Sequence, residues 1–560
     1  MAITATTGEG QVSVGVNVDI RVRTVSGNRL VDDYVAGAPG LAPFFPGHPH
    51  DPTAYRRKAD ELASRFDAAS AGAMAEAVRP LGDPAADRLE RIAAGRGFVV
   101  TTGQQPGLFG GPLYTVHKAL SAIALAERLE SLLDAPVLPL FWIASDDHDW
   151  AEASHVSVLD AANALHRLEL TGDGQSRRSM GRRRLLGAAE SALDELEQVL
   201  PPSDFTPAIL ERLRAIYGDP VNTVAHAFAA TMEGVLEGLP LGFVDAQHPA
   251  LRRLGAGVLR HELESAAAHE AALREQTERL EAAGYEAQVT IPPGAANVFH
   301  EDGEHGRERL LREDGKWVLR ASKRELSDAE LWSLFDASPD DFSPNVVLRP
   351  VVESAVFPTL AYVAGPGEVR YLAQTGCLFA AHGVGMPLVF PRLSVTLIEG
   401  KVGKVMEKFG LSESDFLERP VHELISGVVR EDVPPEVEES VNRLRQALQE
   451  RYQALYEAAE GIDPTLKGPI FNARNEGFRA VAEVEKKIRQ HVKLKRETEL
   501  EQIEKAAVNL VPDGRPQERV LNVHQYLARY GRALIPAILE RMEVGIDRTP
   551  RAEWKGVSCD

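Results

Sequence analysis

Four short polar segments of this sequence carry residue types that could do chemistry. They are Thr102-Gly103-Gln104-Gln105-Pro106-Gly107, Asp146-Asp147-His148-Asp149, Gly365-Pro366-Gly367-Glu368 and Pro391-Arg392-Leu393-Ser394. Each segment follows an apolar run that is typical of a buried strand. Because ligands of open α/β sheets bind beyond the carboxyl ends of the strands, we expect the four segments to meet in one crevice.

The first segment is rich in glycine and amide side chains and leads into a helix predicted over residues 113–133. The free amides and positive dipole of a helix N-terminus favour an anion such as phosphate or carboxylate. His117 and Lys118 lie inside this helix, and Lys118 could add a positive charge. Neither the dinucleotide fingerprint GxGxxG nor the phosphate-loop pattern GxxxxGKS/T is present. A tight packing turn is the alternative interpretation.

The acidic segment places three carboxylates and an imidazole at a strand end. Asp147, His148 and Asp149 could orient a substrate amine, act as a general base or hold a divalent cation through oxygen ligands. A charged loop that caps a helix is the competing interpretation. No second histidine stands at a recognised ligand spacing from His148, which weakens the case for zinc, and we name no metal ligands.

The last two segments offer a flexible backbone and a cation. Gly365 and Gly367 allow the backbone to approach a ligand closely, and Glu368 could accept hydrogen bonds from a ribose or an ammonium group. The Arg392 guanidinium could clamp a phosphate or carboxylate with two parallel hydrogen bonds. We therefore expect Arg392→Ala to lower activity sharply without unfolding the protein.

The elements that must position these segments form an α/β core. The order strand, loop, helix, strand over residues 98–144 predicts a βαβ unit, and its uninterrupted apolar strands favour a parallel sheet covered on both faces. Helical periodicity predicts helices over residues 56–97 and 250–284. Residues 160–240 and 285–345 interrupt the core as two insertions, and turn signals in the second predict several strands.

The C-terminal third has a different pattern. Its apolar residues recur every three or four positions, at Val437, Val441, Leu444, Leu448, Tyr452, Leu455, Ala459 and Ile462. A second stripe follows the helix-breaking turn Gly461-Ile462-Asp463-Pro464. Two such stripes predict an antiparallel coiled-coil hairpin. The hairpin needs a surface on which to bury its apolar stripe, so we infer a homodimer.

Composition excludes several classes of protein. The 560 residues include 62 Lys+Arg and 82 Asp+Glu, and this net charge of −20 disfavours nonspecific nucleic-acid binding. No run approaches the roughly 18 apolar residues of a membrane span, and the first residues lack a signal-peptide pattern. Two cysteines, Cys377 and Cys559, build neither a disulfide framework nor a cysteine zinc site. We expect a soluble cytoplasmic protein with no nucleic-acid or membrane partner.

The motifs together resemble the BshC family, the cysteine-adding enzymes of bacillithiol biosynthesis. The resemblance lies in residues 102–118, in Phe141-Trp142-Ile143-Ala144 with Asp147-His148-Asp149, in Gly365-Pro366-Gly367-Glu368, in Pro391-Arg392-Leu393-Ser394, and in Gln517-Glu518-Arg519 with Asn522. These stretches are spread over most of the chain and occur in family order. Asp146 stands where glutamate is expected, and Gly110 where threonine is usual.

The resemblance implies a Rossmann-like core with two connecting insertions, similar to class I aminoacyl-tRNA synthetases, and a dimer-forming antiparallel α-helical coiled coil. It implies that the protein joins L-cysteine to glucosaminyl-malate through an amide bond, with an activated cysteinyl carboxylate and with ATP as the candidate cofactor. The synthetase signatures HIGH and KMSKS are absent.

The predicted organisation follows from this core. Its parts are residues 1–159 (N-terminal segment and first half of the core), 160–240 (first insertion), 241–284 (core), 285–345 (second insertion), 346–430 (second half of the core), 431–511 (coiled-coil hairpin) and 512–560 (a C-terminal segment packing on the core).

Two sets of site residues follow from the hypothesis of a ligase. The catalytic candidates are Asp147, His148, Asp149 and Arg392. The candidates for binding substrate or nucleotide are Thr102, Gly103, Gln104, Gln105, Gly107, His117, Lys118, Trp142, Gly365, Gly367, Glu368 and Ser394. Two alternatives stay open: a noncatalytic dimeric binding protein with a synthetase-like core, and a metal-dependent hydrolase built on residues 146–149.

Overall fold

The computed structural model describes residues 18–172 and 177–547, so Cys559 lies outside the described residues. The chain divides into two compact units. One unit contains residues 1–396 and 518–560, and the other contains residues 397–517. None of the helices in the described ranges is both long enough and apolar enough to cross a membrane.

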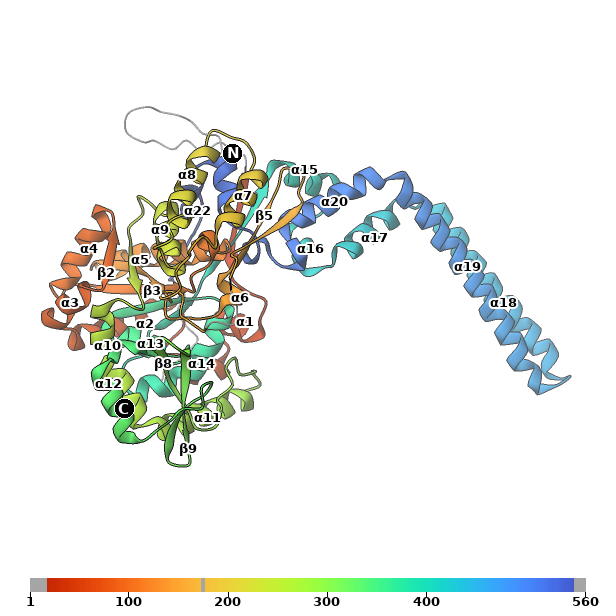
Figure 1. The fold of residues 1–560 in the computed structure, drawn as a ribbon. Coiled ribbons are helices and arrows are strands. Elements are labelled where there is room, and N and C mark those ends of the chain that lie inside the picture. Colours follow the sequence, from red (N-terminus) through yellow and green to blue (C-terminus); the bar gives the residue numbers. More distant parts are fainter. Residues whose placement is uncertain (1–17, 173–176, 548–560) are drawn as a thin grey trace. The chain divides into compact units, whose positions relative to one another are not determined.

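A six-stranded sheet forms the centre of the first unit (Figure 1). Its order is β14 (Leu388–Pro391), β13 (Thr359–Ala364), β3 (Phe98–Gln104), β4 (Val137–Ile143), β7 (Leu241–Asp245) and β2 (Val78–Leu81). All strands run parallel except β2, which pairs antiparallel with β7. The strand order reverses between β3 and β13, as in doubly wound nucleotide-binding folds. The predicted Rossmann-like α/β core is therefore confirmed.

Helices cover both faces of this sheet, which explains why its central strands are buried. All seven residues of β4 are buried, as are all six of β13. Side chains of α2 (Pro52–Arg65) and α5 (Tyr114–Leu133) share a core with Val100 and Val137 on one face. Val99 and Leu138 point to the other face, toward α4 (Asp83–Ala93) and α10 (Pro249–Glu264). This alternation is what a strand period of two requires.

Two predicted helices are interrupted. The helix expected over residues 56–97 is wrong at Val78–Leu81, where strand β2 lies between α3 (Ala68–Ala75) and α4. Because β2 is the edge strand, Pro80 is accommodated with little loss of sheet hydrogen bonding. The helix expected over residues 250–284 is divided at Ser265 into α10 and α11 (Ala266–Ala282).

The two insertions have different structures. A hairpin of β5 (His155–Leu159) and β6 (Leu165–Glu169), which the sequence did not predict, spans the start of the first insertion. The helices α7 (Glu190–Val199), α8 (Thr206–Tyr217) and α9 (Val224–Val235) follow it. The second is strand-rich as predicted. Its antiparallel sheet has the order β11 (Glu325–Leu326), β10 (Lys316–Leu319), β9 (Gly306–Glu313), β8 (Ala295–Asp302) and β12 (Phe342–Pro344), with α12 (Asp328–Ala337) beside it.

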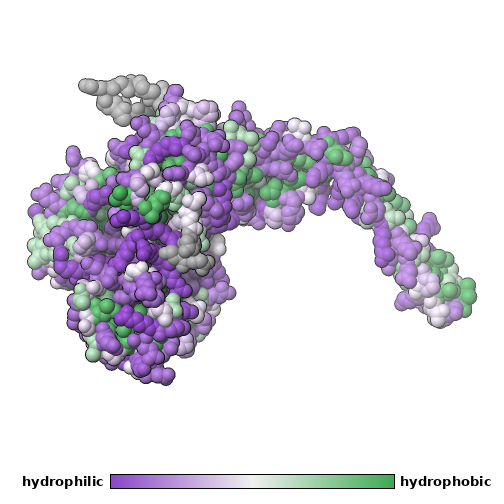
Figure 2. Space-filling view, viewed as in Figure 1, coloured by the Kyte–Doolittle hydropathy of each residue, from purple (hydrophilic) through white to green (hydrophobic). Residues whose placement is uncertain are grey.

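The second unit is helical. A small core joins α15 (Gly400–Phe409), α16 (Glu413–Glu418), α17 (Val421–Glu431) and α20 (Glu497–Leu510), and α18 (Pro435–Glu460) and α19 (Lys467–Lys495) form a hairpin. The residues of the predicted apolar stripe of α18 differ in exposure. Leu448 and Tyr452 lie beside Gly477 of α19, whereas Leu444 and Leu455 are each 51% exposed. Figure 2 shows hydrophobic side chains along this hairpin.

Candidate functional site

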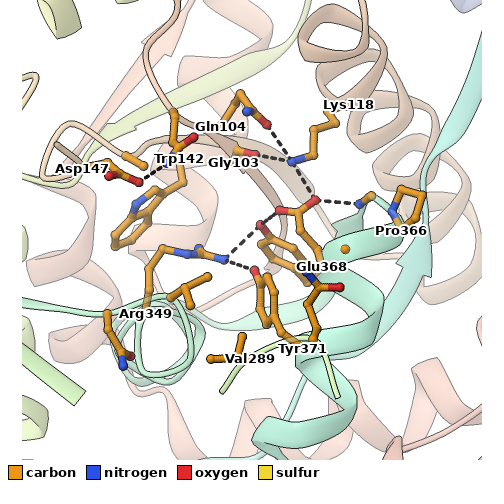
Figure 3. Close-up of a pocket in the computed structure, with 18 of the residues that line it drawn as sticks. Gly103, Gln104, Lys118, Trp142, Asp147, Val289, Arg349, Pro366, Glu368 and Tyr371 are labelled. Carbon is orange, nitrogen blue, oxygen red and sulfur yellow. Dashed lines mark hydrogen bonds and ion pairs between the residues drawn. The ribbon is translucent and has the colours of Figure 1, made fainter. Parts of the chain in front are cut away.

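A cavity of about 450 Å³ lies at the carboxyl ends of the parallel strands, where the strand order reverses (Figure 3). Strands β3, β4 and β13, the N-terminus of α14 (Pro366–Ala381) and residues of the second insertion all contribute to its wall. The lining residues include Gly103, Gln104, Gln105, Tyr114, Lys118, Trp142, Asp146, Asp147, Gln288, Arg307, Asn345, Arg349, Tyr362, Gly365, Gly367, Glu368, Tyr371, Arg392 and Arg519. The crevice predicted at this edge of the sheet therefore exists.

Lys118 connects the two sides of the strand reversal. Its Nζ lies 2.7 Å from Glu368 Oε2 and donates to the Gly103 carbonyl at 2.5 Å and to Gln104 Oε1 at 3.1 Å (Figure 3). Burial lowers the pKa of Lys118, and Glu368 opposes this effect. The three partners use all three ammonium hydrogens. Lys118 therefore fixes the end of β3 against the start of α14.

Glu368 is held by more than Lys118. The Tyr362 hydroxyl donates to its Oε1 at 2.6 Å, and the Gly365 amide donates to its Oε2 at 2.6 Å. Burial raises the pKa of Glu368, but Lys118 and these hydrogen bonds outweigh burial and keep it below the usual value. Glu368 is therefore an ionised carboxylate fixed at the cavity wall.

Arg349 lies on the opposite wall. Its guanidinium donates to Glu353 Oε2 at 2.8 Å and to the hydroxyls of Tyr362 and Tyr371 at 3.0 and 3.2 Å. It also lies 5.7 Å from the centroid of the Trp142 ring. The buried Trp142 Nε1–H has no acceptor among the residues that the structure describes. A ligand oxygen in the cavity would satisfy this indole donor.

Two carboxylates of the acidic segment, Asp146 and Asp147, line the cavity, and hydrogen bonds hold Asp147 in place. It accepts hydrogen bonds from the His148 amide at 2.6 Å, from the Asp149 amide at 3.1 Å and from the Gln105 side chain. A carboxylate has about four acceptor positions, so one remains for a ligand.

The other members of the acidic segment are placed differently. His148 lies 3.5 Å from Arg307 Nη1, and burial together with this cation lowers the pKa of the imidazole. Asp149 is exposed and caps α6 (Trp150–Ala153), where it accepts from the Glu152 amide at 3.2 Å. The capping interpretation therefore describes Asp149, and neither residue lines the cavity.

Arg392 is held by Glu518 of the C-terminal segment. Its Nη1 and Nη2 donate to the two oxygens of Glu518 at 2.8 and 2.6 Å, and Glu518 also contacts His117 Nδ1 at 3.0 Å. Burial raises the pKa of Glu518, but Arg392 and His117 hold it well below its usual range. The two parallel hydrogen bonds expected for a ligand are made with Glu518 in this structure, and the catalytic role of Arg392 stays a prediction. Arg392 is a buried partner of the C-terminal segment that also forms part of the cavity wall.

At its helix end, the loop before α5 has its backbone amides occupied by protein partners. The amides of Phe109, Gly111 and Leu113 donate to Tyr217, Leu108 and Leu521. The Asn522 side chain donates to the carbonyls of Phe109 and Gly111 at 2.9 and 2.7 Å. The C-terminal segment thus covers the start of the helix, and this part of the loop is the packing turn of the alternative interpretation.

The remaining predicted binding residues divide into two sets. Gly103, Gln104, Gln105, Lys118, Trp142, Gly365, Gly367 and Glu368 line the cavity. Thr102, Gly107, His117 and Ser394 do not. The Thr102 hydroxyl donates to the Val363 carbonyl at 2.9 Å and joins β3 to β13. A Cβ at Gly107 would lie 3.0 Å from Gly111 Cα, which explains the glycine by packing.

Sequence reasoning missed much of the opposite wall. Arg349 interrupts the apolar run Val346-Val347-Leu348, and a single cation there was a usable signal. Gln288, Arg307 and Asn345 come from the second insertion and carry no local signal. Their proximity arises from tertiary packing alone.

The fold and the cavity together define a Rossmann-like protein with a polar small-molecule site at the strand reversal. Comparison with known families narrows this class. Residues 17–393 match the family described as "Bacillithiol biosynthesis BshC, N-terminal Rossmann-like domain", and residues 395–545 match its "C-terminal coiled-coil domain". The chain therefore belongs to the BshC family of bacillithiol biosynthesis.

Curated relatives agree with this assignment. A protein of Salinibacter ruber is 34% identical over 90% of this chain and 92% of its own length. A protein of Chlorobaculum tepidum is 34% identical over 80% and 81%, and one of Bacillus licheniformis is 30% identical over 92% and 95%. All three are named "Putative cysteine ligase BshC".

Proposed function

We propose that this protein is a ligase that joins the carboxyl group of L-cysteine to the amine of glucosaminyl-malate through an amide bond. One observation carries the proposal: the family stretches around Gln104, Asp147 and Glu368 come from distant parts of the chain and line one cavity. The names of the relatives support the same reaction class.

The cavity has groups that suit both ends of such substrates. Arg519 lines it and forms no ion pair or hydrogen bond among the described residues, so its guanidinium is free for a carboxylate. The remaining acceptor position of Asp147 suits the substrate ammonium, which must lose a proton before its nitrogen attacks a carbonyl carbon. The aromatic faces of Trp142 and Tyr114 offer apolar surface to a sugar ring.

We propose ATP as the activating co-reactant. The groups that fit a phosphate are the guanidinium of Arg519 and the open backbone at Gly367, not the packed loop before α5. ATP would supply the activation of the cysteine carboxylate. The protein's own residues would hold the two substrates together and exclude water, which raises the effective concentration of amine at the carboxyl carbon.

Mass spectrometry of the product tests this function. The protein is incubated with isotopically labelled cysteine and glucosaminyl-malate, with and without ATP. A product with the summed mass minus one water, formed only with ATP, is the expected result. Ligand-dependent stabilisation without any product would instead favour the noncatalytic binding protein.

The acidic segment does not support the alternative of a metal-dependent hydrolase, because Asp149 caps a helix and Asp147 accepts hydrogen bonds within its own turn.

We also propose that the protein is a homodimer formed through the exposed apolar residues of α18 and α19. Besides Leu444 and Leu455, Val484 is 56% exposed and Leu494 is 65% exposed. Such a surface on a helical hairpin is typical of a helix-packing interface.

We place the protein in the cytoplasm, because a chain with two cysteines builds no disulfide framework.

A further inference from the structure

A second cluster of chemically active side chains lies outside the cavity. It consists of Glu262 in the last turn of α10, His269 in the first turn of α11 and His382 at the C-terminal cap of α14. One potential ligand atom from each residue lies within 4.8 Å of the other two. The side chains are 0%, 4% and 2% exposed, so their heads meet inside the protein.

The separations are close to those of a coordination shell. Glu262 Oε2 lies 2.6 Å from His269 Nδ1 and 3.1 Å from His382 Nε2. Two ligands on a tetrahedral ion, each about 2.0–2.1 Å from it, lie about 3.3 Å apart. Shifts of about 1 Å would therefore convert the hydrogen-bonded triad into a ligand set. Each imidazole would then carry its proton on the other ring nitrogen.

The surroundings fix the carboxylate in the way that metal sites do. The second oxygen of Glu262 accepts from the Asn297 side chain at 2.8 Å, and Asn297 Oδ1 accepts from Asn345 at 2.8 Å. Such outer hydrogen bonds orient the side chains that coordinate a metal ion. The ring of His261 lies 5.0 Å from that of His382 and is partly exposed.

We propose that Glu262, His269 and His382 bind one Zn²⁺ ion, with water in the fourth position. Two imidazoles and one carboxylate are a ligand set that zinc accepts and that hard cations such as Mg²⁺ do not favour. The ion would fasten the ends of α10 and α14 to the start of α11. We assign it a fastening role, because none of the three ligands lines the cavity.

Metal binding by the full chain tests the proposal. The protein is stripped with a chelator and titrated with Zn²⁺ by calorimetry, and its Tm is measured with and without the ion. We expect one Zn²⁺ per chain and a Tm increase of about 2 °C or more. Mg²⁺ should give neither effect. Absence of a stoichiometric zinc site in the wild type would overturn the proposal.

Variants locate the ion. His382→Asn should weaken Zn²⁺ binding at least 100-fold, whereas His305→Asn, at a partly exposed histidine of the same unit, should leave it unchanged. Equal affinity in His382→Asn and the wild type would also overturn the proposal. Anomalous diffraction of wild-type crystals at the zinc edge does not depend on a folded variant. A peak among the three side chains is expected, and a peak elsewhere contradicts the assignment.

Discussion

Arg392 and Glu518 form a buried ion pair whose two halves are far apart in the sequence. Removal of one partner leaves an uncompensated buried charge, which costs about 3–5 kcal/mol. We therefore expect Arg392→Ala to lower the free energy of unfolding by about this amount, measured by urea denaturation. The double change Arg392→Met with Glu518→Leu should be closer to the wild type. An Arg392→Ala protein as stable as the wild type would contradict this structural role and favour the predicted role of Arg392 in binding a ligand.

Arg519 differs from Arg392 because it forms no ion pair among the described residues. A charge-assisted hydrogen bond contributes about 1.5–3 kcal/mol, or roughly 10- to 100-fold in affinity. We expect Arg519→Gln to raise the KM of an anionic substrate by this factor while the Tm stays unchanged. Arg91→Gln, at an exposed residue of α4, is the matched control. Unchanged KM in Arg519→Gln would remove this residue from substrate binding.

His524 provides a prediction for pH. Burial lowers its pKa from 6.5 to about 4, so the unfolded chain binds the proton more tightly than the folded protein does. Stability should therefore be complete above pH 6.5 and fall by about 3 kcal/mol as the pH decreases to 4. Chemical denaturation across this range measures the effect. The pH slope should be smaller in His524→Gln, and equal slopes in both proteins would contradict the assignment.

At the scale of elements, the exposed apolar residues of α18 form the interface of the proposed dimer. A glutamate introduced there would lose its hydration in the interface, which costs free energy and disfavours association. We expect Leu444→Glu with Leu455→Glu to produce a monomer in light scattering without loss of helical circular dichroism. Gln446→Glu with Gln453→Glu changes the same charge on the same helix and should remain dimeric. A dimeric leucine variant would place the interface elsewhere.

The sequence predicted those elements whose pattern is set by burial on both faces. Strand β4 is a continuous apolar run and β3 begins with one, so their burial in a parallel sheet could be predicted directly from the sequence. Strand β2 was missed because Val78-Arg79-Pro80 lies between helical stretches and forms only through pairing with β7. Local periodicity contains no information about such a distant partner.

The candidate site could be predicted from the sequence only in part. The strand-end residues Gln104, Asp147 and Glu368 were found because the parallel topology brings strand ends together. The structural roles of Arg392 and His117 could not be predicted, since both depend on Glu518. A residue type shows which bonds a side chain can make, but the tertiary structure decides which partner it meets.

At the scale of the whole molecule, the first unit is built from two separate stretches of chain. Residues after 517 supply Glu518, Asn522 and His524, which cover the start of α5 and pair with Arg392. We expect a chain that ends at residue 517 to lose hydrogen-exchange protection in β3 and β4 but to keep it in α18 and α19. A chain that ends at residue 547 should match the full protein. Full protection of β3 in the shorter chain would contradict this dependence.

The ion pair of Arg392 and Glu518 can form only late during synthesis on the ribosome. Arg392 emerges 126 residues before Glu518, and a ribosome adds about 5–20 residues per second. For roughly 6–25 s the nascent sheet holds a guanidinium without its counter-ion, while the whole helical hairpin is being translated. The Rossmann-like unit, although encoded first, should therefore complete its folding last, and nascent chains stalled inside the hairpin should be the ones that chaperones recognise.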